Sequence, residues 1–199
     1  MKPETYSMAF STGGLFHAES VKLCTRYLEV KDWDIVRIQT IESNLLQTRT
    51  ATSLKRVYRE VFSRLVTLRE EELEFLALAN ETDQAYLIWI SICRRYPFIA
   101  EFASEVLRER YLSLKTDLHH EDFDSFFNRK SQWHPEIERI TPMTRSKLRQ
   151  VLFKMLREAG LLSTDNIILP SMMSNNLLEL IRQQRPEELS FFPIFDYNL

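Results

Sequence analysis

The chain has 199 residues, a formal net charge of −2, 44% hydrophobic residues and 27% charged residues. This length is enough for one large domain or two small ones, and the composition is that of a folded protein rather than a disordered one. Only three glycines are present, which argues against a turn-rich β sandwich. The near-neutral overall charge gives no support by itself for binding nucleic acid.

The cellular compartment is predicted from the cysteines and from the apolar runs. Cys24 and Cys93 each lie in an apolar stretch of helical character, so we expect two buried free thiols, as in a reducing compartment. The first ten residues lack an apolar run of signal-peptide length. The longest apolar run, near 85–93, is too short for a membrane-spanning helix, which needs about 20 residues. We therefore expect a cytoplasmic protein.

Three helices are predicted in the first third of the chain, after an irregular start and a glycine turn. Apolar residues at helical spacing place them at about 16–30, 33–42 and 51–68. Asp32 is the expected N-cap of the second helix. The third helix has an apolar stripe on one face and the basic side chains Lys55, Arg56 and Arg59 on the opposite face.

The middle of the chain is also predicted to be helical. A run of glutamates opens a helix that reaches Ala79, and the next helix continues to Tyr96. Its stretch AYLIWISIC is apolar on all sides, which is typical of a helix at the centre of a fold. Pro97 opens a further helix to about Leu112. One short helix is predicted in HHEDFDSFFNRK, with its phenylalanines facing inward. Another short helix is predicted over 135–140.

The last part of the chain contains the clearest helix boundaries. Thr141 is the expected N-cap, Pro142 the first residue and Gly160 the C-terminal cap of a helix that ends at Ala159. A final helix is predicted near 175–184. The only β structure that we expect is a short element near 166–169. The predicted fold class is therefore all-α.

The charges divide the chain unevenly. Residues 1–68 carry 10 basic and 7 acidic residues, residues 69–139 carry 9 basic and 15 acidic, and residues 140–199 carry 7 basic and 6 acidic. We therefore expect a relatively basic N-terminal subdomain over 1–68. A second subdomain over 69–199 would contain the acidic middle and the basic helix 142–159. A single continuous domain remains the alternative.

Catalytic motifs are missing from the sequence. There is no glycine-rich phosphate loop, no HExxH and no CxxC. His119, Glu121, Asp122 and Asp124 could form a loose metal site, but a solvated acidic helix start is the preferred interpretation of these residues. We predict a non-enzymatic protein with no cofactor.

Two basic stretches, TRTATSLKRVYRE and TRSKLRQVLFKMLRE, combine positive charges with hydroxyl groups, a mixture that suits phosphate oxygens. Solvated helix faces are the alternative explanation. The residues that we nominate as nucleic-acid contacts are Arg49, Lys55, Arg56, Arg59, Arg145, Lys147, Arg149 and Lys154.

Segments spread along nearly the whole chain carry a resemblance to a known family. They are YSMAFSTGGLFHAES, DWDIVR, NLLQTRTATSLKRVYREVFSRL, WISICRRYPFIAEFASEVLRERYLSL, EDFDSFFNRK, LRQVLFKMLREAGLL and FFPIFD. In these segments the chain resembles the BrxA family of bacteriophage exclusion (BREX) defence systems. This is a likeness of the whole sequence, not of a catalytic signature.

The resemblance implies a helical fold similar to the NusB antitermination factor. It also implies a role in phage defence that involves double-stranded DNA and other BREX proteins, among them a methyltransferase and an ATPase. Sequence specificity should be low, since no motif of a major-groove reader is present. The rival hypothesis is a protein–protein adaptor that does not touch DNA, in which the acidic middle and the final SFFPIF segment would contact BREX partners.

Overall fold

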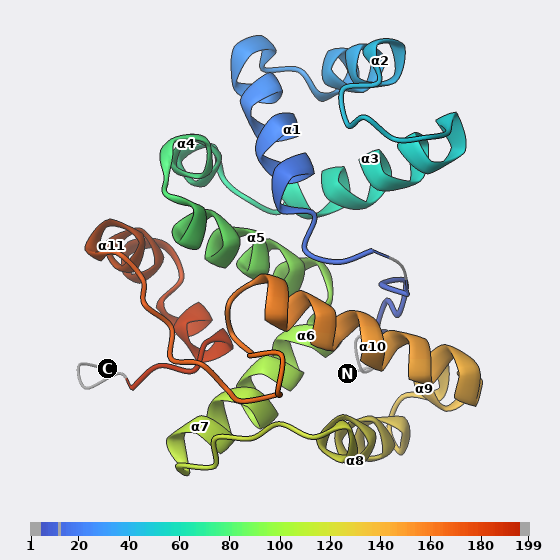
Figure 1. Cartoon of the computed structure of the whole chain (residues 1–199), viewed down its shortest axis with the longest axis vertical. Coiled ribbons are helices and arrows are strands. Elements are labelled where there is room, and N and C mark those ends of the chain that lie inside the picture. The colour runs from blue at the N-terminus through green and yellow to red at the C-terminus, as the bar shows by residue number, and fades with distance from the viewer. Residues whose placement is uncertain (1–4, 12, 196–199) are drawn as a thin grey trace.

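Three helices form one end of the molecule in the computed structural model, which describes residues 5–11 and 13–195 (Figure 1). They are α1 (His17–Val30), α2 (Trp33–Ser43) and α3 (Ala51–Leu65). Asp32 caps α2 by accepting hydrogen bonds from the backbone amides of Asp34 and Ile35, and Thr50 caps α3 by accepting one from the Ser53 amide. The helices that the sequence predicts here are confirmed, except that α3 ends three residues early.

The centre of the fold is α5 (Glu81–Arg95), which follows the short helix α4 (Glu70–Leu78). Every residue of α5 from Asp83 to Cys93 is buried, as the all-round apolar pattern predicts. Helices α1, α3, α4 and α6 all pack against α5.

A long continuous helix follows, as predicted, but its middle is π-helical. It consists of α6 (Pro97–Phe102), a π-helical segment (Ala103–Arg108) and α7 (Glu109–Leu112). Helix α8 (His120–Ser131) packs its phenylalanines on this helix, with the ring centroids of Phe98 and Phe126 at 5.1 Å. The short α9 (Pro135–Glu138) leads to α10. The phenylalanines of these helices are therefore core, as expected.

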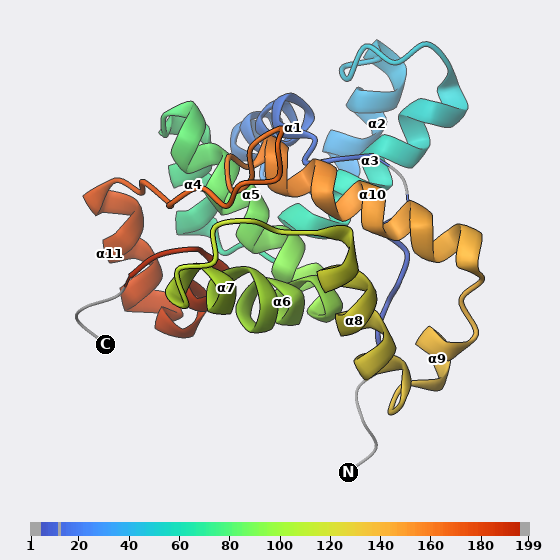
Figure 2. The same cartoon turned by 60° about the horizontal axis from the view of Figure 1, so that its bottom comes forward.

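The C-terminal part consists of α10 (Pro142–Glu158), α11 (Asn175–Gln184) and a 3-10 helix (Pro186–Phe191). Figure 2 shows α10 lying across the molecule close to α3 and α6. The β element expected near 166–169 is reduced to two isolated antiparallel bridges, one to Asp117 and one to Leu162, and the described residues form no sheet. The all-α fold class is confirmed.

One cluster of buried apolar side chains extends through the whole fold, from Tyr6 to Phe192. It includes residues on both sides of position 68, so the basic and acidic regions share this core. The division into two subdomains at that position stays a prediction. Cys24 and Cys93 are buried free thiols, and burial raises the pKa of both. Among the described residues, no helix has the length and apolar character needed to cross a membrane.

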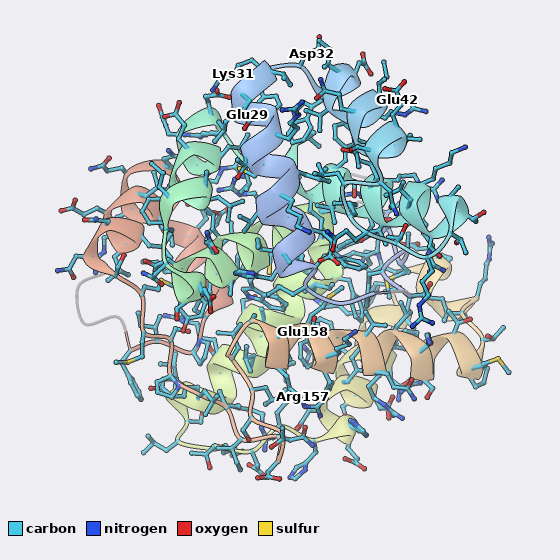
Figure 3. All side chains as sticks on the ribbon, turned by 45° about the horizontal axis from the view of Figure 1, so that its top comes forward. Glu29, Lys31, Asp32, Glu42, Arg157 and Glu158 are labelled. Carbon is cyan, nitrogen blue, oxygen red and sulfur yellow. The ribbon has the colours of Figure 1, made fainter. Side chains whose placement is uncertain are left out.

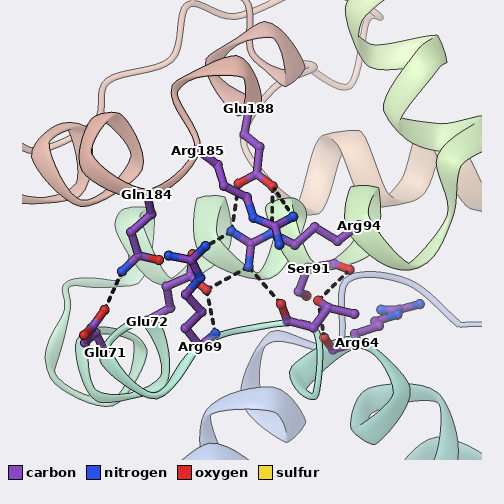
Figure 4. A network of polar contacts seen from close by, with 10 residues as sticks. Arg64, Arg69, Glu71, Glu72, Ser91, Arg94, Gln184, Arg185 and Glu188 are labelled. Carbon is purple, nitrogen blue, oxygen red and sulfur yellow. Dashed lines mark hydrogen bonds and ion pairs between the residues drawn. The ribbon is translucent and has the colours of Figure 1, made fainter.

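A buried ion-pair network joins the C-terminal 3-10 helix to α4 and α5 (Figure 4). The Arg94 guanidinium donates to Glu72 at 2.6 Å, to Glu188 at 2.7 Å and to the backbone carbonyl of Thr67 at 2.9 Å. Burial alone would lower the pKa of Arg94. The hydrogen bonds to Glu72 and Glu188, together with the charges of these carboxylates, raise the pKa by more, so the net shift is upward. The charge of Arg94 is therefore used to hold three segments together.

Candidate nucleic-acid interface

The basic face of α3 follows directly from the periodicity of its sequence. Leu54, Tyr58, Val61 and Leu65 are buried, and this places Lys55, Arg56 and Arg59 on the outside. None of these three cations forms an ion pair with the residues that the structure describes. Arg49 is also exposed, in the loop that precedes the helix.

Helix α10 divides its basic residues between two sides. Lys147 and Lys154 are exposed. Lys154 lies 3.6 Å from Glu158, one turn further along, and Lys147 has no acidic partner in residues 5–11 or 13–195. An exposed pair at this distance is weak, so both lysines can bind an external anion.

Arg145 and Arg149 face α8 instead. Both contact the Asp124 carboxylate, Arg145 through Nε at 2.9 Å and Arg149 through Nη1 at 2.5 Å. Arg145 also donates to Asn128 and lies over the Phe127 ring, 4.6 Å from its centroid. The charge of these two arginines is therefore partly used to attach α10 to α8.

The N-terminal segment holds α3 and α10 in a fixed relation. Arg64 of α3 is buried and donates to the carbonyl oxygens of Gly14 at 2.9 Å and Leu15 at 3.2 Å. On the other side, the Leu15 amide donates to Glu158 of α10 at 2.6 Å. Figure 3 shows Glu158 on the edge of α10 nearest this segment. A Cβ atom at position 14 would lie 2.2 Å from a Glu158 oxygen, so a side chain there would displace this carboxylate from the Leu15 amide.

Further contacts, made through Glu60, keep the Arg64 side chain in place. Its Nε and Nη2 donate to Glu60, one turn earlier on α3, and the Tyr96 hydroxyl donates to the same carboxylate at 2.6 Å. Burial lowers the pKa of Arg64, and the neighbouring Glu60 opposes this shift.

Three hollows lie along the exposed side of α10, and neighbouring hollows share lining residues. The central hollow, about 400 Å³, is lined by Gly13, Arg56, Lys147 and Lys154 among others. It shares Lys147 with a hollow of about 560 Å³ near the start of α10, which also contains three hydroxyl side chains. It shares Lys154 with a hollow of about 400 Å³ near the end of the helix. We call this feature the α3–α10 groove.

A separate pocket of about 420 Å³ opens between α2 and α3. Lys55 and Arg59 of α3 and Arg37 of α2 stand around aromatic side chains in this pocket. The nominated cations of α3 therefore face two sites, because Arg56 lines the α3–α10 groove while Lys55 and Arg59 line the α2–α3 pocket.

The loose metal site suggested by the sequence is divided among other contacts. His119 lies beside Asp117, Asp122 is paired with Arg110, and Asp124 is paired with the arginines of α10. Within the described residues, no group of three or more acidic, histidine or cysteine side chains is arranged around a common point for a metal ion.

The two features suggested for an adaptor role are largely engaged within the chain. In the acidic middle, Glu70 and Glu74 pair with Lys31, and Glu105 pairs with Arg129 and Lys130. In the SFFPIF segment, Phe192 is fully buried, and the Phe191 carbonyl accepts a hydrogen bond from the Trp89 indole. Less of either feature is therefore free for a partner than the sequence suggests.

Comparison with known proteins decides the family. The BrxA family model matches residues 4–185. The chain belongs to the BrxA family. Two relatives named "BREX protein BrxA" are similar to it, one from Escherichia coli O9:H4 (strain HS) and one from Bacillus cereus (strain H3081.97). The first is 24% identical over 76% of this chain and 71% of its own length, and the second is 28% identical over 64% of each.

A solved structure has a similar fold. A crystal structure of an uncharacterized protein from Magnetospirillum magneticum superposes with a TM-score of 0.80 and 18% sequence identity. The match covers 96% of this chain and 98% of that one. At this identity the likeness concerns the fold alone.

Sequence reasoning missed several residues of these two sites. Gly13 and Gln150 line the α3–α10 groove, and Arg37 lines the α2–α3 pocket. Arg37 follows Trp33 by one helical turn, a spacing that places both on one side of α2 and was a usable signal. No comparable signal in the sequence placed Gly13 beside α10, because that contact joins segments more than 130 residues apart.

Proposed function

We propose that this BrxA-family chain is a non-enzymatic component of a BREX phage-defence system, and that it binds double-stranded DNA with low sequence specificity. In this proposal it acts in the cytoplasm beside other BREX proteins, including a methyltransferase and an ATPase. The observation that carries the DNA proposal is the α3–α10 groove, lined by the exposed cations Arg56, Lys147 and Lys154.

The dimensions of the groove suit a nucleic-acid backbone. Helix α10 has 17 residues, which at 1.5 Å per residue corresponds to about 25 Å, or the axial rise of roughly seven base pairs of a DNA duplex. Hydroxyl groups of Ser11, Thr144 and Ser146 lie beside Lys147 in the same groove and can donate to phosphate oxygens. Contacts of this kind fix position and orientation but carry no base sequence, which is why we propose low specificity.

The other nominated residues take different places in the proposal. Arg49, Lys55 and Arg59 extend the positive surface beyond the groove on the α3 side. Arg145 and Arg149 contribute less to DNA binding, because Asp124 already balances part of their charge.

A salt titration of DNA binding tests the proposal. We would compare the parent with the variant Arg56→Ala/Lys147→Ala/Lys154→Ala, using fluorescence anisotropy of a labelled duplex at several salt concentrations. Each lost phosphate contact should lower the slope of log affinity against log salt by about one unit, equally for unrelated sequences. Alanine is well tolerated on exposed helix faces, so the variant should remain folded.

A matched control removes the same charge elsewhere. The variant Lys22→Ala/Lys115→Ala/Arg139→Ala neutralises three exposed cations that do not line the groove. It should leave the salt slope close to that of the parent. If the groove variant is folded and binds as tightly as the parent at every salt concentration, the groove is not a DNA surface, and the adaptor hypothesis takes the lead.

A further inference from the structure

The α2–α3 pocket is walled by three aromatic rings. Tyr58 and Phe62 of α3 lie nearly parallel, with an interplanar angle of 7° and centroids 5.8 Å apart. Trp33 of α2 meets Phe62 edge to face, with centroids 5.3 Å apart. All three rings line a cavity of about 420 Å³ that is open to solvent. This volume is within the range of small-molecule sites, about 300–1,000 Å³.

The aromatic wall is held rigidly by neighbours behind it. Tyr27 of α1 stacks on Trp33, with centroids 4.2 Å apart and an interplanar angle of 14°. The Tyr58 hydroxyl donates to the backbone carbonyl of Trp33 at 3.2 Å. Burial raises the pKa of Tyr58 to about 12, so this phenol stays a neutral donor at physiological pH. A ligand that stacks here would not have to reorganise the wall.

The rim of the pocket is positive. Arg37, Lys55 and Arg59 are exposed, and none of the three pairs with an acidic side chain in the described parts of the chain. Asp34 is the single acidic residue of the lining. The pocket therefore combines an apolar aromatic surface with an excess of two positive charges.

We propose that the α2–α3 pocket binds one nucleotide, with its base against the aromatic wall and its phosphate at Arg37, Lys55 and Arg59. Bases stack on aromatic side chains without regard to sequence, and guanidinium groups bind phosphate through paired hydrogen bonds. Each half of the pocket matches one half of this ligand. A purely apolar ligand would leave the cations unused, and an inorganic anion would leave the aromatic rings unused.

The nucleotide has two possible sources, a free mononucleotide or an unpaired base in bound DNA. The second source rests on the function proposed above. Helix α3 is shared by both sites, since Arg56 faces the α3–α10 groove while Lys55 and Arg59 face the pocket. Figure 1 shows α2 beside α3. In this proposal, a base extruded from a duplex in the groove reaches the α2 side of α3.

Tryptophan fluorescence reports occupation of the pocket directly. Trp89 is fully buried, whereas Trp133 is 74% exposed and would respond to any nearby ligand, so the experiment uses a Trp133→Phe background. The probes are a fully paired duplex, the same duplex with one unpaired adenine at its centre, and adenosine monophosphate. We expect the unpaired adenine to quench Trp33 and to improve affinity by about tenfold over the paired duplex, as one stacked base does elsewhere.

The variant Arg37→Ala separates the pocket from the groove. It should remove most of the advantage of the unpaired adenine and leave affinity for the paired duplex within about twofold of the parent. Quenching by adenosine monophosphate without binding of either duplex would support the pocket and refute the proposed DNA function. Equal affinity for both duplexes, with no quenching by any probe, would overturn the pocket proposal and leave the DNA function standing.

Discussion

In the α3–α10 groove, Arg56 and Lys147 are exposed and lack an acidic partner among the described residues, whereas Arg94 is enclosed by two carboxylates in the network of Figure 4. The side chain of Arg94 is only 6% exposed. Chemically similar cations therefore have opposite roles in the two regions. In the network the positive charge is paired with buried carboxylates of the same chain. In the groove the positive charge remains available to a ligand. What distinguishes the regions is the placement of acidic residues from distant parts of the chain.

The largest expected effect is a loss of stability when the buried Arg94 network is broken. In the described part of the chain, Arg94→Ala leaves Glu72 buried without a cationic partner and Glu188 with only the longer pair to Arg185. Breaking a buried ion pair costs about 3–5 kcal/mol. We expect urea denaturation to show this loss of unfolding free energy. The matched control is Arg56→Ala, for which the expected change is within about 0.5 kcal/mol. Similar losses for both variants would show that the two regions do not differ as described.

A smaller effect is expected from the phenol that supports the Arg64 anchor. Tyr96→Phe removes the hydrogen bond from the hydroxyl to Glu60 and should cost about 1 kcal/mol near pH 7. Burial and the bond to Glu60 raise the pKa of Tyr96 above its usual value of about 10. The unfolded chain therefore ionises first as pH rises. The phenol contributes its full stability below about pH 10 and loses it above that pH.

Urea unfolding of the parent and Tyr96→Phe at pH 7, 10 and 11.5 measures this dependence. The difference between the two proteins should shrink above pH 10, because the phenylalanine variant has no group to ionise at this position. A constant difference across this range would contradict the assignment. The result would show how much stability the protonated Tyr96 hydroxyl gives to the contacts around Arg64, next to the groove.

Arg149 gives the smallest expected change and stands between the two regions. Its side chain is 23% exposed, and its partner Asp124 is 32% exposed. We expect Arg149→Ala to lose roughly 0.5–1 kcal/mol of stability, since partly exposed pairs are weak. The salt slope of DNA binding should change less than it does for Lys147→Ala, which removes an exposed, unpartnered cation. A larger change in slope for Arg149→Ala than for Lys147→Ala would show that Arg149 contributes to DNA binding.

Local features of the fold were predictable because their signals lie within a few residues. Thr141, Pro142 and Gly160 mark the ends of α10 in the sequence and in the structure. Site geometry was less accessible. Lys147 and Arg149 look alike in the sequence, yet only Arg149 meets Asp124, which lies 25 residues earlier on another helix. The π-helical segment within the predicted helix 97–112 likewise had no local signal.

The α2–α3 pocket also could not be predicted from the sequence, although its aromatic residues could be. Tyr58 and Phe62 are four residues apart on α3, a spacing that predicts packing, and they do pack on each other and on Trp33 of α2. The spacing could not indicate that the packed rings would leave a cavity bordered by Arg37. Side-chain shape and the crossing of α2 over α3 decide this, and neither is encoded within a short window of sequence.

The N-terminal segment has a consequence for how this protein is made. The Tyr6 amide donates to Glu136 of α9, and the Leu15 amide donates to Glu158 of α10, so an early segment is bound by helices more than 120 residues later. During synthesis these acceptors leave the ribosome only after most of the chain has emerged. The groove therefore closes late, when α10 arrives to complete contacts of high sequence separation. A nascent chain therefore has no finished groove, and a chain that stops before Glu158 should not form the proposed DNA surface.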